Sequence, residues 1–379
     1  MRVATVEEGS TRLLVPRESL ESSSPPSAPA FFNPAASVNR DVSVAVTAAA
    51  GGTTMCDSLA GVGARGVRVA NETPRRMEVT VVDFNRIALR LAERSARLNG
   101  VRTRCDFVLD EARRALYSRH GKGERFDFVD VDPFGSPAPF IAAAVSATAD
   151  GGTLSLTATD TAALCGVYPA VTVRRYAAAP LNNEFHHETG ARILMNAVRR
   201  EAAAVERGIV PVAAHCTRHY IRVYARLEDG PARADASVKN EGYVTVCREC
   251  FDVRGAPAPR ELCELCGGKV GSAGPLWLGP LTDGGVVGRA ATICEERALT
   301  GGMKVLAGLK DVDAYPPWGY SIDGICSRLR KATVPESGVR EYLGSQGFHC
   351  GRQPFEKRGI KTDAPYASVR EAVERVKAS

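Results

Sequence analysis

The chain has 379 residues, of which 44% are hydrophobic and 24% charged, and its formal net charge is +6. These proportions are typical of a globular protein that is long enough for two domains. No apolar stretch approaches the roughly 18–20 residues that a membrane-spanning helix needs, and the N-terminus lacks an apolar signal core. An odd number of cysteines, eleven, argues against a disulfide scaffold. We therefore expect a cytoplasmic protein with no membrane partner and no obligatory protein partner.

The first fifty residues predict three elements. Short strands at 3–6 and 11–15 form a hairpin, and a Ser/Pro-rich loop follows at 22–29. An apolar segment at 42–50 then has the pattern of a helix.

From residue 55 onward, strands and helices alternate at the spacing of βαβ units. This pattern predicts a doubly wound α/β sheet whose ligands bind at the carboxyl ends of the strands. The predicted strands are 55–59, 78–82, 105–109, 126–131 and 152–157, and the predicted helices are 64–70, 85–99, 112–117 and 141–149.

The rest of the first domain is predicted to be one long helix and two strands. The helix covers 182–207, and strands 210–216 and 220–227 are expected to finish the sheet as a pair. The polar segment 228–237 contains Gly and Pro and has the composition of a linker. We therefore predict a catalytic domain at 1–230 and a second domain at 231–379.

The tetrapeptide Asp132-Pro133-Phe134-Gly135 follows the strand 126–131 and carries the most specific chemistry. A carboxylate accepts adjacent N–H donors, such as the ring N–H and the amino group of guanine. Pro133 stiffens the turn, and Phe134 can stack on a flat base. The sequence therefore predicts that Asp132 is a catalytic acid that holds an amino-bearing base.

Three earlier strand ends match the parts of one adenosyl ligand. A glycine loop at 57–66 joins a strand to a helix, and Asp83 at the next strand end can reach both hydroxyls of a ribose. The third strand end, with Asp110, Glu111 and Ala112, can meet the adenine amino group. With Asp132 beside the methyl group, this order favours a Rossmann-like S-adenosylmethionine-dependent methyltransferase over a dehydrogenase.

Four cysteines form two Cys-x2-Cys pairs within residues 243–270. Thiolates with this spacing on two turns close a tetrahedral metal site and leave no open position. The sequence therefore predicts a structural Zn²⁺ in a ribbon, held by Cys247, Cys250, Cys263 and Cys266.

The C-terminal part predicts a helix at 321–330, a helix at 335–346 and a strand at 348–355, which is the order of a winged helix. A plain α+β packing module is the alternative. The basic residues Arg352, Lys357, Arg358 and Lys361 suit contacts with RNA.

The pair His186-His187 has no third metal ligand at useful spacing in the sequence, so we expect a polar helix start there rather than a metal site.

Taken together, these motifs resemble the tRNA (guanine-26) dimethyltransferases of the archaeal and eukaryotic type. The resemblance covers nearly the whole chain and includes residues 31–34 with 39–41, 63–68, 130–137, 157–166, 274–281, and 359–365. It implies S-adenosyl-L-methionine as the donor, a tRNA partner, and one or two methyl transfers to the amino group of one guanine.

The resemblance also implies site residues. The cofactor contacts carry over onto Arg40, Arg65, Asp83 and Ala112, and the catalytic acid onto Asp132. The family has Asp before the alanine at 112, whereas this chain has Glu111 preceded by Asp110, and either could meet the adenine. The full set of expected site residues is Asp132, Pro133 and Phe134 for catalysis, and Phe31, Arg40, Arg65, Asp83, Glu111 and Ala112 for the cofactor.

Two alternatives remain open at this point. An amino-methyltransferase with the same core could act on another structured RNA or on DNA. A non-catalytic RNA-binding protein could also retain a methyltransferase core, although the presence of both Asp132 and Asp83 disfavours it.

Overall fold

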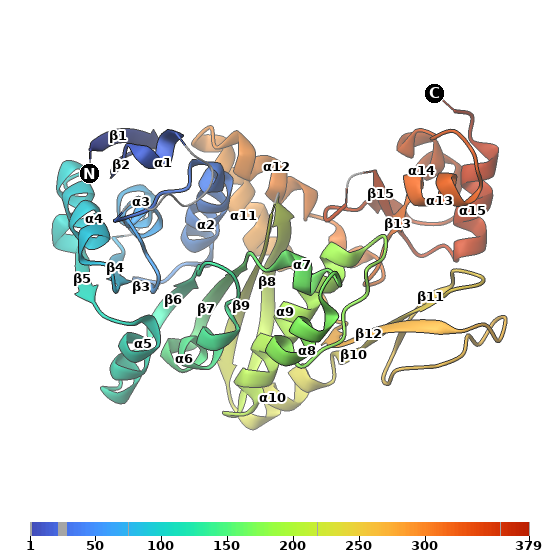
Figure 1. Ribbon diagram of the computed structural model, residues 1–379, viewed down its shortest axis with the longest axis horizontal. Coiled ribbons are helices and arrows are strands. Elements are labelled where there is room, and N and C mark those ends of the chain that lie inside the picture. Colours follow the sequence, from blue (N-terminus) through green and yellow to red (C-terminus); the bar gives the residue numbers. More distant parts are fainter. Residues whose placement is uncertain (1, 22–28, 75, 218, 357, 379) are drawn as a thin grey trace.

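A computed structural model describes residues 2–21, 29–74, 76–217, 219–356 and 358–378. The predicted loop at 22–29 lies almost entirely outside these residues. The larger lobe is built on a seven-stranded sheet of order β5-β4-β3-β6-β7-β9-β8 (Figure 1). Its strands are β3 (Thr54–Asp57), β4 (Glu78–Asp83), β5 (Cys105–Leu109), β6 (Phe126–Val131), β7 (Thr148–Ala158), β8 (Arg207–Thr217) and β9 (Tyr220–Asp229).

The topology confirms the predicted doubly wound sheet. The strands β3 to β7 are parallel, and the strand order reverses at β3, which lies between β4 and β6. The last two strands form the expected pair, with β9 antiparallel to both β7 and β8. The helices of this lobe are α3 (Ala64–Glu72), α4 (Arg86–Leu98), α5 (Ala112–Gly121), α6 (Ile141–Ala147), α7 (Thr161–Leu164), α8 (Pro169–Tyr176), α9 (His186–Ala203) and α10 (Pro231–Val238). Among the described residues, no helix is long and apolar enough to cross a membrane.

Two sequence predictions in this lobe are wrong. The long helix at 182–207 is shorter, because Glu206 takes a left-handed conformation with φ of 56° and β8 begins at Arg207. The segment 228–237 is not a linker. It ends β9 and forms α10, whose Ser237 Oγ accepts a hydrogen bond from Ile209 N of β8 at 3.2 Å. The approach is so close that a Cβ on Gly208 would lie 2.4 Å from the carbonyl oxygen of Arg233.

The N-terminal hairpin is confirmed as β1 (Val3–Glu8) and β2 (Thr11–Pro16). It shares a hydrophobic core with α2 (Ser37–Ala50) and with two helices from much later in the chain, α11 (Gly284–Glu296) and α12 (Thr300–Gly308). Figure 1 shows α11 and α12 beside α2. Part of the predicted second domain, 231–379, therefore packs against the first lobe, and the division into two domains stays a prediction.

The smaller lobe contains two three-stranded sheets. One is a ribbon of order β11-β10-β12, and the other has order β13-β15-β14 (Figure 1). The predicted helix–helix–strand order is present in the second, and the structure adds β13 and α15, but the winged-helix assignment stays a prediction. The elements are β10 (Glu241–Cys247), β11 (Val253–Ala256), β12 (Val270–Trp277), β13 (Tyr320–Ser321), α13 (Ile322–Arg328), α14 (Glu336–Ser345), β14 (Cys350–Arg352), β15 (Gly359–Thr362) and α15 (Tyr366–Arg375).

A buried ionic cluster joins the two lobes. Lys361 Nζ of β15 donates to both carboxylate oxygens of Glu188 of α9, at 2.6 and 2.8 Å, and both side chains are fully buried. Arg192 and Gln353 also donate to this carboxylate. Lys361, expected from the sequence to contact RNA, is therefore unavailable to a partner. It holds the C-terminal module, which is the part of the smaller lobe from β13 to α15, on α9.

The charges around Glu188 dictate a response to acid. Burial raises the pKa of this carboxyl, but Lys361 and Arg192 outweigh that effect and lower the pKa from 4.5 to about 2. Between pH 4.5 and about 2, the Glu188 carboxyl binds its proton more tightly in the unfolded chain than in the folded chain. The stabilisation is therefore complete above about pH 4.5 and is lost as the pH falls towards 2.

We predict that Glu188→Gln lowers the free energy of unfolding at pH 7 by about 3–5 kcal/mol, since it leaves a buried lysine without its counter-charge. Urea unfolding of both proteins measures this difference, which should shrink as the pH falls from 4.5 towards 2. Glu374→Gln is the matched control, because Glu374 forms an exposed pair with Arg370 on α15, and its effect should stay within about 0.5 kcal/mol. Equal losses in the two variants would contradict a special role for the cluster.

Candidate active site

A cavity of about 440 Å³ lies at the carboxyl ends of β3, β4 and β6, next to the point where the strand order reverses. This is the usual ligand position in a doubly wound sheet, and the volume falls within the usual range for ligand pockets. Its walls come from the segment before α2, the loops after β3, β4 and β6, and the ends of β7 and β9. The residues that line it include Phe31, Asn39, Arg40, Gly61, Asp83, Phe84, Asn85, Asp132, Pro133, Phe134, Thr157 and Tyr220.

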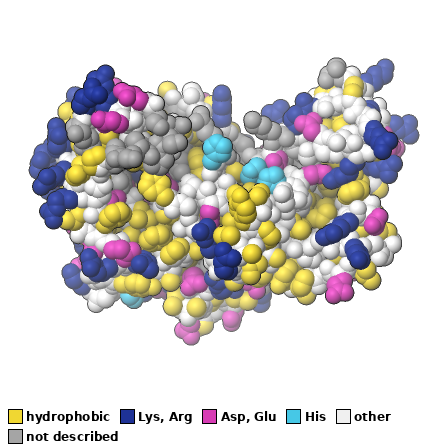
Figure 2. Space-filling view, in the orientation of Figure 1, with side chains coloured by type: hydrophobic (Ala, Val, Ile, Leu, Met, Phe, Trp, Pro, Cys, Tyr) yellow, Lys and Arg dark blue, Asp and Glu magenta, His cyan; other side chains and the backbone are white. Residues whose placement is uncertain are grey.

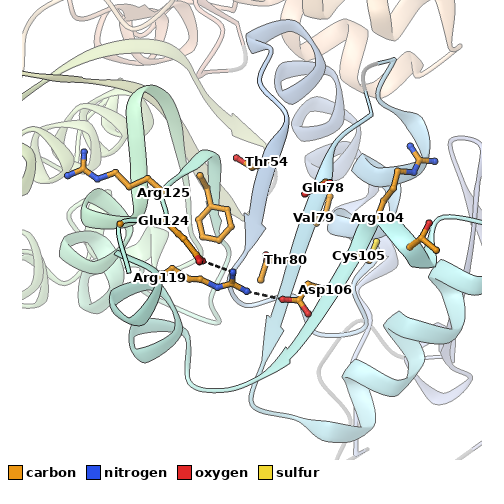
Figure 3. A pocket seen from close by; sticks show the side chains of 13 residues that line it. Thr54, Glu78, Val79, Thr80, Arg104, Cys105, Asp106, Arg119, Glu124 and Arg125 are labelled. Carbon is orange, nitrogen blue, oxygen red and sulfur yellow. Dashed lines mark hydrogen bonds and ion pairs between the residues drawn. The ribbon is translucent and has the colours of Figure 1, made fainter. Parts of the chain in front are cut away.

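A second cavity, of about 600 Å³, lies at the opposite end of the parallel strands, where their amino ends meet (Figure 3). Its lining includes the first residues of β4 and β5, Glu78 and Cys105. The guanidinium of Arg119 is held there between Asp106 and Glu124, at 2.8 Å from each (Figure 3). Because ligands of such sheets bind at carboxyl ends, this amino-end cavity is not the candidate active site.

The glycine loop and Asp83 form one side of the candidate site. Asp83 ends β4, and its two carboxylate oxygens accept hydrogen bonds from Gly61 N at 2.7 Å and Asn85 N at 2.8 Å. Burial raises the pKa of Asp83, and the two N–H donors oppose that rise. Gly63 has φ of 72°, and a Cβ there would lie 2.5 Å from Ala92 of α4. The loop is thus held against α4 and β4, and each oxygen of Asp83 keeps a lone pair for a ligand.

Two phenylalanines lie at the mouth of the cavity. The rings of Phe31 and Phe134 have their centroids 5.7 Å apart and are tilted by 48°. Phe134 is 78% exposed, which is unusual for a large apolar side chain and leaves one face open to a flat ligand. Arg40 lines the same cavity, with its guanidinium 4.8 Å from the centre of the Phe32 ring; Glu8 accepts from its Nε at 2.6 Å and the carbonyl of Asn33 accepts from its Nη2 at 2.9 Å. The predicted residues Phe31, Arg40 and Phe134 therefore come together.

Asp132 is held from behind by a chain of buried charges. Arg65 of α3 pairs with the Oδ2 atom of Asp132, and its Nε lies 2.9 Å from Asp130. Arg222 of β9 pairs with the other oxygen of Asp130. The Asp132 side chain is 27% exposed, whereas those of Asp130 and Arg222 are fully buried. The sequence Arg222–Asp130–Arg65–Asp132 thus leads from the core to the cavity.

The two arginines, Arg222 and Arg65, determine the charge state of Asp130. Burial raises the pKa of Asp130, but Arg222 and Arg65 reverse the effect and hold it below its ordinary value. The neighbouring Asp57 has the opposite balance: burial, and then the charge of Asp130, raise its pKa to about 7. Asp57 accepts a hydrogen bond from Gly66 N at 2.9 Å, which ties the first turn of α3 to β3.

Not every predicted cofactor residue lines the cavity. Arg65 lies beneath it, Ala112 is buried, and Glu111 caps α5 by accepting from Arg114 N at 3.1 Å. Asp110 is occupied by an ion pair with Arg114. For these residues a direct cofactor contact stays a prediction.

Several residues of the site were missed from the sequence. Asn85 could have been found, because it is the N-cap of α4 directly after Asp83. Thr157, Tyr220 and Arg222 lie on the last strands of the sheet, and the sequence carries no local signal that links them to Asp132.

The four predicted metal-binding cysteines form a compact group in the ribbon. Their sulfur atoms all lie within 4.8 Å of one another, with Cys247 Sγ 3.5 Å from Cys266 Sγ and Cys250 Sγ 3.6 Å from Cys263 Sγ. The backbone N–H groups of Glu249 and Cys250 both donate to Cys247 Sγ at 3.4 Å. Burial raises the pKa of Cys247, but these donors outweigh it and lower the pKa to about 7, whereas burial and the neighbouring thiols raise the pKa of Cys250 to about 12. The donor set fits a tetrahedral Zn²⁺ site.

Comparison with known proteins gives the same picture along almost the entire chain. The model of the N2,N2-dimethylguanosine tRNA methyltransferase family matches residues 9–374. A tRNA (guanine(26)-N(2))-dimethyltransferase of Methanothermobacter thermautotrophicus is 35% identical over 381 residues, covering 97% of this chain and 98% of that protein. The Methanopyrus kandleri enzyme of the same name is 37% identical over 369 residues, with 96% and 94% covered.

A solved structure is also similar over its full length. Trm1 from Pyrococcus horikoshii, in complex with S-adenosyl-L-methionine, has a TM-score of 0.85 and 30% sequence identity, and the match covers 97% of this chain and 99% of that one. With the strand order, the cavity at the switch point and the Asp132 turn already established, these matches show that the chain belongs to the N2,N2-dimethylguanosine tRNA methyltransferase family.

Proposed function

We propose that this chain is an S-adenosyl-L-methionine-dependent methyltransferase that transfers one or two methyl groups to the exocyclic amino group of guanine 26 in tRNA. The single observation that supports it most is the placement of Asp132. Its carboxylate lies in the switch-point cavity, held from behind by Arg65 and flanked by Phe134, in a chain of this family.

The residues of the cavity fit the cofactor. The amino end of α3 and the loop before it offer backbone N–H groups to the amino-acid part, and Asp83 offers acceptors to the ribose hydroxyls. A Cβ at Gly61 would meet nothing closer than 3.8 Å, so the loop leaves open space on the ligand side. The cofactor supplies an electrophilic methyl group on a sulfonium, and the chain's own residues have only to bind and orient.

Asp132 orients the guanine amino group. Its Oδ2 is bound by Arg65, whereas Oδ1 has no hydrogen-bond donor among the described residues and can accept from a substrate. A guanine amine is a weak nucleophile because its lone pair is delocalised into the ring. A fixed carboxylate that accepts its N–H favours the geometry and the charge that develop as the nitrogen becomes tetrahedral. The open face of Phe134 supplies stacking for the base, which leaves the tRNA stack to enter the cavity.

The smaller lobe is the proposed second contact with tRNA. Figure 2 shows Lys and Arg side chains around this lobe and a hollow between it and the larger one. Within this lobe, the ribbon packs against the C-terminal module. Phe251, next to Cys250, packs against Tyr366 of α15 with ring centroids 5.6 Å apart, and the guanidinium of Arg328 lies 4.1 Å from the centre of its ring. We propose that Cys247, Cys250, Cys263 and Cys266 bind a structural Zn²⁺ that fixes Phe251 and hence the contact between the ribbon and the C-terminal module.

We expect the purified protein to methylate a tRNA transcript with guanine at position 26 and to leave a transcript with adenine there unmodified. Nucleoside mass spectrometry of the digested product identifies N2-methyl and N2,N2-dimethylguanosine. Methylation of ribosomal RNA or duplex DNA, with none of tRNA, would favour an amino-methyltransferase for those substrates. Cofactor binding without methylation of any of them would favour a non-catalytic RNA-binding protein.

Within the same assay, Asp132→Asn should reduce the rate on the order of 10²–10³-fold or more, because an amide donates where the substrate also donates. Asp106→Asn is the matched control, since Asp106 is also paired with an arginine but lies at the amino end of its strand, away from the candidate site. A variant that keeps the wild-type rate would remove Asp132 from the catalytic assignment.

Asp83→Ala should weaken S-adenosyl-L-methionine binding about tenfold or more, since hydrogen bonds to a charged group contribute roughly 1.5–3 kcal/mol. Calorimetry measures this affinity, and a gel-shift titration should show unchanged affinity for tRNA. If cofactor affinity is unchanged, Asp83 only organises the loop through its bonds to Gly61 and Asn85.

Cys263→Ser should remove the ribbon zinc, measured by elemental analysis, and weaken tRNA binding while cofactor binding is retained. The physical reason is that the small ribbon depends on its metal to fold and so to fix Phe251. Cys326→Ser serves as the control, because Cys326 is a buried thiol of α13 outside the ribbon. A Cys263→Ser protein that loses zinc but binds tRNA normally would confine the metal to local stability.

A further inference from the structure

A second group of metal-ligating side chains lies at the junction of the two lobes. Cys165 follows the end of α7, and His186 and His187 begin α9. One ligand atom from each lies within 4.8 Å of the other two, and the centroids of the two imidazole rings are 4.2 Å apart. The fold therefore brings to the histidine pair the third ligand that sequence spacing did not reveal.

The hydrogen bonds of the two histidines are those of metal ligands. The backbone carbonyl of Asn183 can only accept, so Nδ1 of His186 donates to it. Nδ1 of His187 donates in the same way to the Glu356 carboxylate, at 2.6 Å. In each neutral ring, the lone pair is then on Nε2. Within the part of the chain that the structure describes, neither Nε2 atom has a hydrogen-bond partner.

A second shell of this kind fixes the tautomer and the orientation of histidines that bind metals. A polar helix start needs none of it. The free backbone N–H groups at the start of a helix need hydrogen-bond acceptors. The two imidazole rings, with their protons fixed on Nδ1, instead direct the lone pairs of their Nε2 atoms away from those bonds, where a metal ion can accept them. The neighbouring thiol of Cys165 is buried and adds a soft donor.

We propose that Cys165, His186 and His187 form a second metal site, separate from the ribbon, that binds Zn²⁺. Two imidazole nitrogens and one thiolate are a zinc donor set, and they leave the fourth tetrahedral position to water. The ion binds the thiolate, and the proton of Cys165 Sγ leaves to solvent.

The location gives the site a structural consequence. Cys165 and the two histidines belong to the larger lobe, whereas Glu356 lies between β14 and β15 of the C-terminal module. Zinc at this place would strengthen the hold of His187 on Glu356, and so connect the two lobes more firmly. Metal occupancy would then affect how firmly the C-terminal module is fixed.

The test counts metal ions in the full chain. Purified protein is equilibrated with a zinc-buffer series and analysed by elemental mass spectrometry. We expect two zinc ions in wild type, one in Cys263→Ser and one in His186→Ala. His349→Ala should keep two, because His349 is exposed and pairs with Asp363 away from the site. One zinc in wild type at saturation would overturn the proposal, as would two in His186→Ala.

Cobalt gives an independent readout that does not depend on the stability of His186→Ala. In the Cys263→Ser background, Co²⁺ should give the spectrum of a tetrahedral site with a single thiolate, and Cys165→Ser in that background should abolish its sulfur charge-transfer band. A spectrum of octahedral, solvent-bound cobalt before that second substitution would also overturn the proposal.

Discussion

The site depends on one physical constraint, the charge balance around the fully buried carboxylate of Asp130. An isolated buried carboxylate is strongly disfavoured, and Asp130 is ionised only because Arg65 and Arg222 both pair with it. Arg65 is in turn oriented by Asp130 and Asn39, so that its remaining guanidinium nitrogen meets Asp132. The position of the Asp132 carboxylate, the proposed catalytic group, is thus set from the core outward, and removing either arginine would leave an uncompensated charge beneath the cavity.

This balance explains why the sheet ends as it does. In the register of the sheet, Asp130 of β6 pairs with Ser155 of β7, and Thr157 of β7 pairs with Arg222 of β9. The antiparallel strand β9, next to β7, brings Arg222 to this depth, where Tyr224 also accepts from its Nε at 2.7 Å. The strand β9 therefore contributes to the support of Asp132.

The sequence predicted the parts of the fold that are local. Strand ends such as Asp83 and Asp132 could be placed because parallel strands align their carboxyl ends, whatever the details of packing. The pairing of Arg222 with Asp130, separated by 92 residues, depends on tertiary packing and has no local signature. The same reason explains why Lys361 was mistaken for a surface cation, and why Cys165 was not connected with His186. The segment 228–237 was misjudged because its composition is polar, although its helix covers β8.

A large, folded substrate makes the relation between the lobes as important as the cavity. In the proposed function, the smaller lobe supports the rest of the tRNA while one base enters the cavity beside Asp132. Two contacts hold the C-terminal module on the larger lobe, the Glu188–Lys361 pair and the bond from His187 to Glu356, and a third, the tilted ring contact of Phe251 with Tyr366, joins the ribbon to that module. The first two contacts are made by neighbouring residues at the start of α9, Glu188 and His187, and the third is made by Phe251 of the cysteine ribbon. The start of α9 and the ribbon therefore act as the two anchors of the C-terminal module, and a change at either one should alter substrate positioning without touching the cofactor.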